Sequence, residues 1–314
     1  MSGSSAPPGA AHPGNAHLRP AHLLLALVVM AVWGTNFVIM KLALTQLPPL
    51  LLAALRFLFV AFPLALVLPR PRVSWRNLAA YGLLIGAGQF GLMFYALTRH
   101  IAPGLASLLM QTQAFFTIAL AMLATGERAR PFQLVATLVA ASGLALIATH
   151  TDGHTSLTGV LLTLGASLAW SLGNTVGRAA GRVNVLAYIA WSSLFAVPPL
   201  LALSFALEGW PRMAASLHAA GWLTWAAVLW QSVGNTIFGY GVWAWLLARY
   251  PASTVSPLSL LVPVFGMGAS ALVLGELMPA WKLLATALVL GGLALNVFWH
   301  PLAGMLARRG WVRR

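Results

Sequence analysis

The sequence predicts an all-α integral membrane protein with ten transmembrane helices, arranged as two inverted repeats of five helices. Three observations predict this class. Hydrophobic residues make up 60% of the 314 residues and charged residues only 7%, whereas a soluble domain has about 25% charged residues. Apolar runs of about 20 residues, long enough to cross a bilayer, follow one another along the chain. The stretch 126–150 recurs without a gap as 275–299.

The composition also excludes several classes of protein. The formal net charge is +14, but the basic residues are scattered between apolar runs. We therefore interpret them as topology signals and expect the lipid bilayer, not nucleic acid, as the partner. The chain contains no cysteine, which excludes disulfides and thiolate metal sites. We expect no cofactor and no metal, and the sequence leaves the oligomeric state open.

The apolar runs define the elements in order. Residues 1–20, rich in Pro, Gly, Ala and Ser, predict a disordered cytoplasmic tail. The first repeat, 21–150, is expected to hold spans near 22–43, 50–68, 77–98, 103–124 and 132–149. The second repeat, 157–300, is expected to hold spans near 158–177, 186–207, 222–247, 252–274 and 281–299. Residues 301–314 form a basic cytoplasmic tail.

The distribution of Lys and Arg predicts the orientation of these spans. With the N-terminus inside, the inner segments hold about three times as many Lys and Arg residues as the outer segments. Both termini are therefore expected in the cytoplasm. A repeat of five helices is odd in number, so its two copies cross the membrane in opposite directions. Such inverted repeats place the substrate site between the halves, near the midplane.

Arg56 is a charged residue within an expected span. It lies about seven residues into the second span, roughly 10 Å deep. A charge there costs about 2.5–3.5 kcal/mol on insertion scales, so the side chain must face protein or water. Two interpretations stand. Arg56 is a counter-ion for a substrate carboxylate or phosphate, or its guanidinium binds free carbonyls at a helix end.

The first and sixth spans carry similar stripes of aromatic and amide residues. Trp33 and Asn36 lie one turn apart on the first span, and Trp170 and Asn174 lie one turn apart on the sixth. One interpretation is that the two stripes face each other across a central cavity. The other is that the tryptophans lie at the membrane interface and the amides join helices. Both tryptophans lie about a dozen residues into their spans, which favours the cavity.

Further amide and aromatic residues recur in the third, fourth and eighth spans: Gln89, Gln111, Gln231, Asn235 and Trp243. Each amide alone is explained by helix–helix contact, but their recurrence favours a polar cavity. Gln111 and Gln113 point about 200° from each other in a regular helix, so only one of them is expected to line it.

The ninth span contains Pro257 and Pro263, which predict a kinked helix beside the cavity that could act as a gate. Pro263 has no N–H, so it leaves the carbonyl of Ser259 free. Glu127 and Glu276 follow glycine at the starts of the fifth and tenth spans, where helix-terminus roles suit them better than transport. Because the four carboxylates all fall outside the middle of the spans, a buried proton relay has little support.

Several motifs, taken together and in order, resemble the EamA branch of the drug/metabolite transporter superfamily. They are Trp33-Gly-Thr-Asn36-Phe-Val, Leu55-Arg56-Phe57, Pro103-Gly-Leu-Ala-Ser107, Gln111-Thr-Gln113-Ala-Phe-Phe116, Gly126-Glu127 and Gly275-Glu276. The resemblance covers roughly residues 22–300. It implies ten helices, two EamA repeats, the bacterial inner membrane and export of amino-acid metabolites of the O-acetylserine and cysteine type.

The leading hypothesis is thus an inner-membrane carrier that exports a small zwitterionic metabolite by alternating access around a midplane cavity. Arg56 would bind the carboxylate, while amide oxygens and aromatic faces would bind the ammonium group. Export, as opposed to import, follows only from the resemblance. The alternative is a broader exporter of aromatic or drug-like compounds. A membrane-embedded enzyme is disfavoured, because the spans show no paired acids, Ser–His pair or metal cluster.

Overall fold

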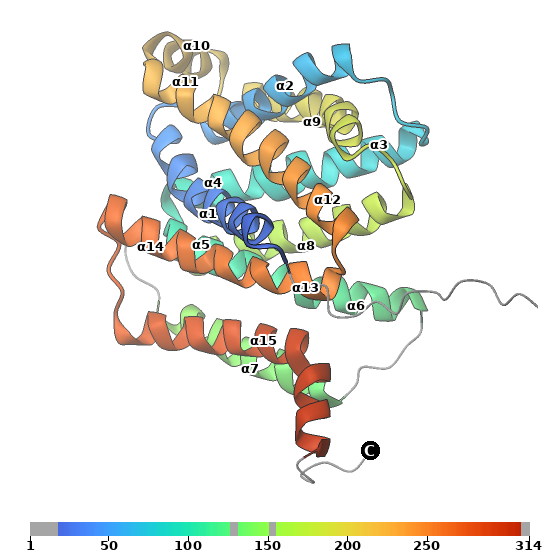
Figure 1. The fold of residues 1–314 in the computed structure, drawn as a ribbon. Helices are drawn as coiled ribbons and strands as arrows, with labels where there is room; N and C mark the ends of the chain where they lie inside the picture. Colours follow the sequence, from blue (N-terminus) through green and yellow to red (C-terminus); the bar gives the residue numbers. More distant parts are fainter. Residues whose placement is uncertain (1–17, 126–130, 151–154, 309–314) are drawn as a thin grey trace, which may run out of the picture.

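A computed structural model describes residues 18–125, 131–150 and 155–308 of the chain (Figure 1). Within these residues the regular structure is helical throughout, so the all-α class is confirmed. Most of the expected N-terminal tail and Glu127 lie outside the described residues.

The helices follow the expected order in both halves. The first half comprises α1 (Pro20–Ala43), α2 (Pro49–Val67), α3 (Trp75–Gly82), η1 (Leu83–Gly91), α4 (Leu92–Arg99), α5 (Pro103–Leu109), η2 (Met110–Thr112), α6 (Gln113–Thr125) and α7 (Pro131–Thr149). The second half comprises α8 (Leu157–Ala179), α9 (Val185–Leu207), α10 (Trp210–Ala219), α11 (Trp222–Leu229), η3 (Trp230–Phe238), α12 (Gly239–Arg249), α13 (Ala252–Val255), η4 (Ser256–Leu261), α14 (Val262–Leu274) and α15 (Ala280–Arg308). Two features differ from expectation. The short helix α10 lies within the connection between the seventh and eighth spans, and α15 continues into the expected C-terminal tail.

Nine helical segments of the described residues are long and apolar enough to cross a membrane. They correspond to all the expected spans except the eighth. That span is present as three consecutive helical elements without a loop between them, α11, η3 and α12. Its middle carries Gln231, Ser232, Asn235 and Thr236, so it is less apolar than the other nine. The count of ten spans therefore stays a prediction.

Local sequence explains where several helices begin. Pro49 and Pro103 occupy the first turns of α2 and α5, where the missing N–H has no intrahelical partner to lose. Ser74, Ser156 and Asn184 precede α3, α8 and α9. Each of their side-chain oxygens accepts a hydrogen bond from the backbone N–H three residues later, which caps the helix.

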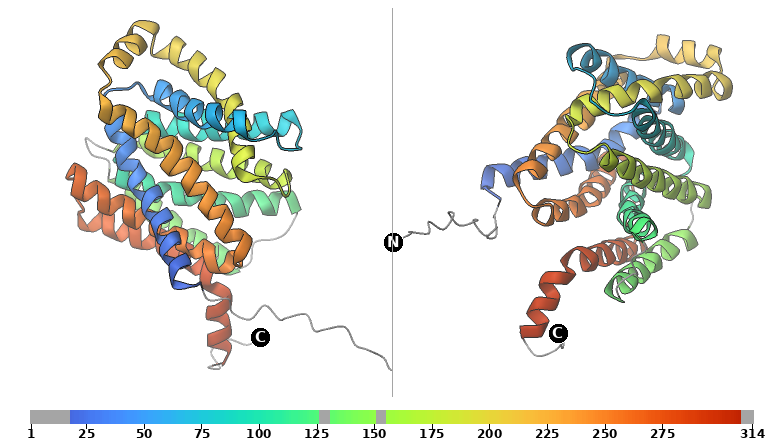
Figure 2. Two further views of the ribbon diagram at one scale, coloured as in Figure 1. Left: turned by 45° about the horizontal axis from the view of Figure 1, so that its top comes forward. Right: turned by 90° about the vertical axis from the view of Figure 1, so that its right-hand side faces the viewer.

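The repeated stretch forms a contact between helices. In Figure 1 and both views of Figure 2, α7 and α15 lie side by side. A Cβ atom on Gly143 would lie 2.9 Å from the backbone oxygen of Ala285, and one on Gly292 would lie 2.5 Å from that of Ala136. Small residues let membrane helices approach closely. The residues that match best between the repeats therefore serve helix packing.

The other contacts join the two halves around a centre. α1 of the first half lies against α14 of the second, α8 of the second lies against α6 of the first, and α2 lies against α9. Gly34 allows the α1–α14 contact, since a Cβ atom there would lie 2.5 Å from the backbone oxygen of Val262. The first span of each half thus packs against the fourth span of the other half: α1 against α14, and α8 against α6. The centre of the molecule is therefore built from both halves.

The third, fourth, eighth and ninth spans contain segments that are not α-helical. The π-helical segments η1 and η3 have nine residues each and interrupt the third and eighth spans. The 3₁₀ segments η2 and η4 interrupt the fourth and ninth. The interruptions fall at corresponding places in the two halves. In transporters with internal repeats, interrupted helices near the midplane form the binding site, so these segments direct attention to the centre.

Candidate functional site

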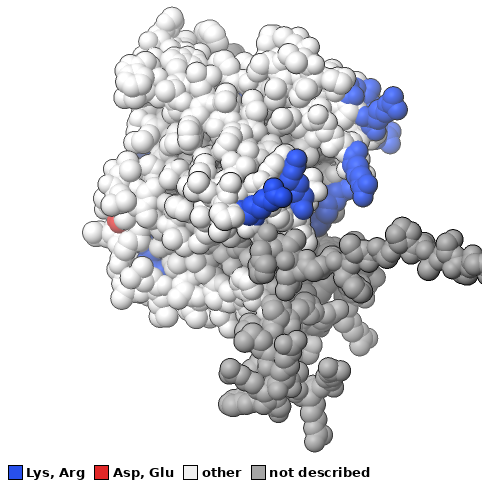
Figure 3. Space-filling view, in the orientation of Figure 1, with Lys and Arg blue, Asp and Glu red and all other residues white. Residues whose placement is uncertain are grey.

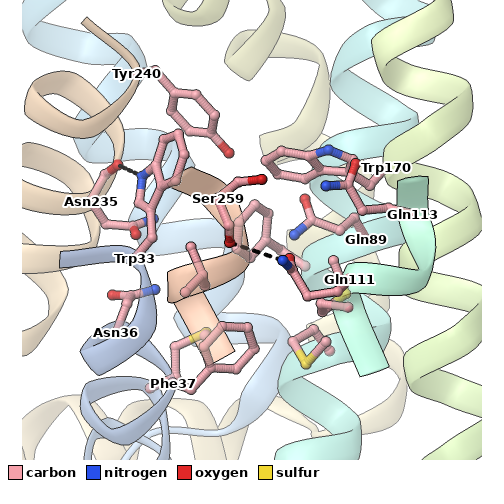
Figure 4. A pocket seen from close by; sticks show the side chains of 15 residues that line it. Trp33, Asn36, Phe37, Gln89, Gln111, Gln113, Trp170, Asn235, Tyr240 and Ser259 are labelled. Atoms are coloured by element: carbon pink, nitrogen blue, oxygen red, sulfur yellow. Dashed lines mark hydrogen bonds between the residues drawn. The ribbon is translucent and has the colours of Figure 1, made fainter. Parts of the chain in front are cut away.

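A cavity of about 110 Å³ lies where the four irregular segments meet α1 and α8 (Figure 4). Both halves of the chain contribute to it. The lining side chains are Trp33, Asn36, Phe37, Met40, Gln89, Phe90, Met93, Met110, Gln111, Gln113, Trp170, Asn235, Tyr240, Ser259 and Val262. We call this space the central cavity.

Aromatic rings form one side of the central cavity. The ring of Tyr240 lies 5.4 Å from that of Trp33 and is stacked at 5.9 Å on that of Trp170. The indole N–H of Trp33 donates to the backbone oxygen of Asn235 at 3.2 Å, which holds the ring in place. Trp243 packs behind Trp33 at 5.4 Å and does not line the cavity. The faces of such rings attract cations.

The irregular segments η2 and η4 meet at a hydrogen bond across the cavity. The Gln111 side-chain N–H₂ donates to the backbone oxygen of Ser259 at 2.9 Å (Figure 4). This is the carbonyl that Pro263 leaves free. Gln113 also lines the cavity, which corrects the expectation that only one of the two glutamines does so. The reason is the 3₁₀ segment, in which residues two apart are separated by about 240° around the helix axis instead of about 200°. The smaller angle between the two side chains thus falls from about 160° to about 120°.

A network of buried polar side chains lies beside the central cavity. The Gln231 side-chain oxygen accepts hydrogen bonds from Asn36 Nδ2 at 3.2 Å and from Arg56 Nη1 at 3.3 Å. Arg56 Nη2 donates to Thr236 Oγ1 at 2.9 Å. A guanidinium group can only donate, so it requires the oxygen of Gln231 to face it. The eighth span and the second span are thereby joined through neutral acceptors.

Arg56 itself does not line the central cavity. Its side chain is 1% exposed, and the guanidinium carbon lies 3.5 Å from the centre of the Phe90 ring. It borders a second, smaller pocket that shares Phe90 and Tyr240 with the central cavity. Its hydrogen bonds go to side chains of η3, so no contact in the described part of the chain supports the interpretation that it binds free carbonyls at a helix end.

The sequence analysis named ten binding residues, and the structure brings six of them to the central cavity: Trp33, Asn36, Gln89, Gln111, Trp170 and Asn235. Arg56, Gln231 and Trp243 form a layer directly behind these residues. Asn174 is half-buried on α8 and does not line the cavity. The two prolines named as gate residues lie at η4: Pro257 within it and Pro263 just after it.

The sequence analysis missed several apolar lining residues, among them Phe90, Met93 and Met110. A signal was present, because Met93 lies one turn after Gln89 and Met110 directly precedes Gln111. Apolar residues are so common in this chain that position next to an amide is the only feature that distinguishes them.

The two carboxylates in the described residues have structural partners outside the central cavity. Glu208 accepts a hydrogen bond from the backbone N–H of Leu50 at 2.7 Å, at the start of α2. Glu276 accepts one from the N–H of Gly104 at 3.0 Å and forms an ion pair with Lys282 at 3.0 Å. Glu276 thus has the expected helix-terminus role, but at the start of α5 instead of its own helix. Negative charge is stabilising at helix N-termini.

Apolar spans, interrupted helices and a cavity between two halves define a class, that of multi-pass membrane transporters with internal repeats. The family model described as "EamA-like transporter family" matches residues 21–149 and 157–298, once in each half. The chain belongs to this family, and it is a multi-pass protein of the bacterial inner membrane. Membership indicates a transporter and not an enzyme.

Relatives with known names support the same family. The chain is 42% identical over 280 residues to a "Probable amino-acid metabolite efflux pump" of Salmonella typhimurium, covering 87% of this chain and 94% of the relative. It is 40% identical over 281 residues to a protein of the same description from Escherichia coli strain K12, covering 88% and 94%. A solved crystal structure with 22% identity superposes with a TM-score of 0.59, covering 93% of this chain and 99% of the other, which shows the fold.

Proposed function

We propose that this protein exports small amino-acid-type metabolites, of the cysteine and O-acetylserine type, from the cytoplasm. The observation on which the proposal depends is the central cavity, which combines aromatic faces with amide groups and has no carboxylate among the described residues that line it. The description of the two relatives as probable amino-acid metabolite efflux pumps supports the substrate class and the direction.

The cavity suits the two charges of a zwitterion. The substrate's ammonium group lies against the faces of Trp33 and Trp170 and donates hydrogen bonds to amide oxygens. Its carboxylate points toward Phe90 and Tyr240, behind which lies the guanidinium of Arg56. Such a substrate satisfies polar groups that have no partner among the described residues, including the side-chain oxygens of Asn36 and Gln89.

We propose ten spans with both termini in the cytoplasm. In Figure 3 most of the visible Lys and Arg side chains lie toward the right of the molecule, where Figure 1 draws the α2–α3 loop, the α8–α9 loop and the end of α12. One further basic patch lies at the left, beside an acidic residue. The basic residues of the two loops and the end of α12 are Arg70, Arg72, Arg76, Arg178, Arg182 and Arg249. Segments far apart in the sequence thus place their positive charges together, as the cytoplasmic face of a membrane protein does.

Alternating access requires that the halves move about the cavity. The Gln111–Ser259 hydrogen bond joins an irregular segment of each half directly at the cavity. A stretch of 3₁₀ helix in the middle of an α-helix often marks a functional hinge. We infer that η2 and η4, with Pro257 and Pro263, form the gate.

A second candidate is a broader exporter of aromatic or drug-like compounds. It is favoured by the flexible thioethers of Met40, Met93 and Met110 in the lining, because methionine surfaces adapt to ligands of different shape. This second candidate is disfavoured for organic cations, because the described residues that line the cavity include no Asp or Glu.

The experiment that tests the proposal is transport by purified protein in proteoliposomes, with and without a pH gradient. The substrates are labelled cysteine, O-acetylserine, phenylalanine and tetraphenylphosphonium. Gln111→Leu is the cavity variant, and Ser142→Ala on the exposed face of α7 is the control. We expect the small zwitterions to be transported by the wild type and the control only. Transport of tetraphenylphosphonium without transport of the zwitterions would establish the second candidate instead.

A further inference from the structure

The second pocket, which contains Arg56, has a distinct chemical character. It is a narrow space of about 10 Å³, room for about one water-sized molecule, between α2, α9, η3 and the junction of α3 with η1. Its polar lining consists of Arg56, Tyr81, Ser192, Ser193, Thr236 and Tyr240. Tyr188 packs edge-on against Tyr81 at 4.8 Å and donates a hydrogen bond to Asn77 at 2.6 Å, which joins α9 to α3 next to this pocket.

Arg56 carries a buried positive charge with no acidic partner in the described part of the chain. The one ion pair among the described residues is Lys282–Glu276, far from Arg56 in sequence and at the start of another helix. Within the same residues, Arg56 Nη1 and Nη2 bind neutral oxygens, and its Nε–H has no partner. Phe90 covers one face of the guanidinium at 3.5 Å. A buried charge is normally paired, because leaving it alone in a low-dielectric site is strongly unfavourable.

Ser192 supplies a second unsatisfied donor at the same pocket. Its side chain is 1% exposed, and its hydroxyl has no hydrogen-bond partner among the residues that the structure describes. Its neighbour Ser193 is also buried, at 2% exposed, but its hydroxyl donates to the backbone oxygen of Ile189 at 2.7 Å. Of these two adjacent serines, Ser192 is therefore the one whose hydroxyl is available to bind a ligand.

We propose that this second pocket is a binding site for a small monovalent anion, held by the guanidinium of Arg56 and the hydroxyl of Ser192. The ligand is a carboxylate or a halide. A halide such as chloride, in exchange with the solution, would neutralise Arg56 in the absence of substrate, and that form of the proposal does not depend on the proposed function. A substrate carboxylate would enter past Phe90 and Tyr240 from the central cavity, and that form rests on the proposed function.

The test compares two adjacent serine variants, Ser192→Ala and Ser193→Ala, in purified protein. The melting temperature is measured while chloride replaces gluconate at constant ionic strength, and separately with cysteine or with its decarboxylated analogue cysteamine. A halide site predicts that chloride stabilises the wild type and Ser193→Ala. A carboxylate site predicts that cysteine stabilises these two proteins more than cysteamine does. In either case Ser192→Ala requires a ligand concentration at least roughly tenfold higher, the loss expected for one hydrogen bond to a charged group.

Two results would overturn the proposal. One is a wild type that responds neither to chloride nor to the carboxylate of cysteine. The other is an equal response of Ser192→Ala and Ser193→Ala, because a general effect of anions on the protein would not distinguish the two hydroxyls. Arg56→Lys, which keeps the charge, provides a further variant that retains some anion response if the site exists. Transport of cysteine without any anion response would leave the proposed function intact and reject the anion site alone.

Discussion

Replacement of Gln231 by leucine or by glutamate should have opposite effects on stability. Gln231→Leu removes the oxygen that accepts from both Arg56 Nη1 and Asn36 Nδ2. Gln231→Glu keeps an oxygen at the same place and adds the negative charge that Arg56 lacks. Both substitutions are close in size to glutamine, so packing alone would change little.

The structure sets the magnitude of the difference. A hydrogen bond to a charged group contributes about 1.5–3 kcal/mol, and a neutral interhelical hydrogen bond in a membrane about 0.6 kcal/mol. Gln231→Leu loses one of each, so the expected cost is about 2–4 kcal/mol. At about 1.5 °C per kcal/mol for a chain of 314 residues, the melting temperature should fall by roughly 3–6 °C.

The assay is thermal unfolding of the purified variants, with membrane expression measured in parallel. Gln231→Glu should melt at or above the wild-type temperature. Any chloride response of this variant should be weaker, because the introduced carboxylate would supply the negative charge that the anion otherwise brings. Equal destabilisation by leucine and glutamate would refute the reasoning, since it would show that the hydrogen bonds of Arg56 do not contribute measurably to stability.

Three other predictions follow from the contacts described. Gly34→Ala should destabilise the protein by about 1–3 kcal/mol, because the added methyl group would lie 2.5 Å from the Val262 carbonyl oxygen. Gly268→Ala is the control, since a Cβ atom there would meet no described atom within 4 Å. Equal melting temperatures of the two variants would contradict the close contact at Gly34. Glu276→Gln should lower the melting temperature by breaking the ion pair with Lys282, yet leave substrate preference in proteoliposomes unchanged; an altered preference would show that Glu276 acts in transport. Reporter fusions should place the loops between spans 2 and 3 and between spans 4 and 5 in the cytoplasm, and the loop between spans 9 and 10 outside. The reverse pattern would reject the proposed orientation.

Much of the architecture could be predicted from the sequence because it depends on local properties. An apolar run of about 20 residues forms a helix in lipid whatever its neighbours are, since every backbone group must be hydrogen-bonded within the segment. Composition and run length were therefore sufficient for the membrane class and for nine of the spans. The repeat that begins at Gly126 and Gly275 was visible because it is a direct similarity of sequence. The family model matches once in each half.

The candidate site could be predicted only in part. Trp33 and Trp170 were found because they are aromatic residues too deep for an interface. The joint contribution of Gln111 and Gln113 was not expected, because it requires the 3₁₀ segment η2. Arg56 lies one layer behind the cavity lining, a position that the sequence could not show, and its binding role stays a prediction. In both cases the deciding partner lies on another helix: Ser259 for Gln111, and Gln231 for Arg56.

The sequence by itself determined the solvent of this protein, the number and length of most of its helices and the duplication of its halves, because hydrophobic burial in lipid depends on composition and length. Only the tertiary structure decided which polar groups meet in the centre and which of the described ones remain without partners. Helix irregularity and side-chain pairing depend on groups far apart in the chain. Arg56 shows the difference, because the sequence marks its charge as unusual and only the fold shows that, among the described residues, no acid neutralises it.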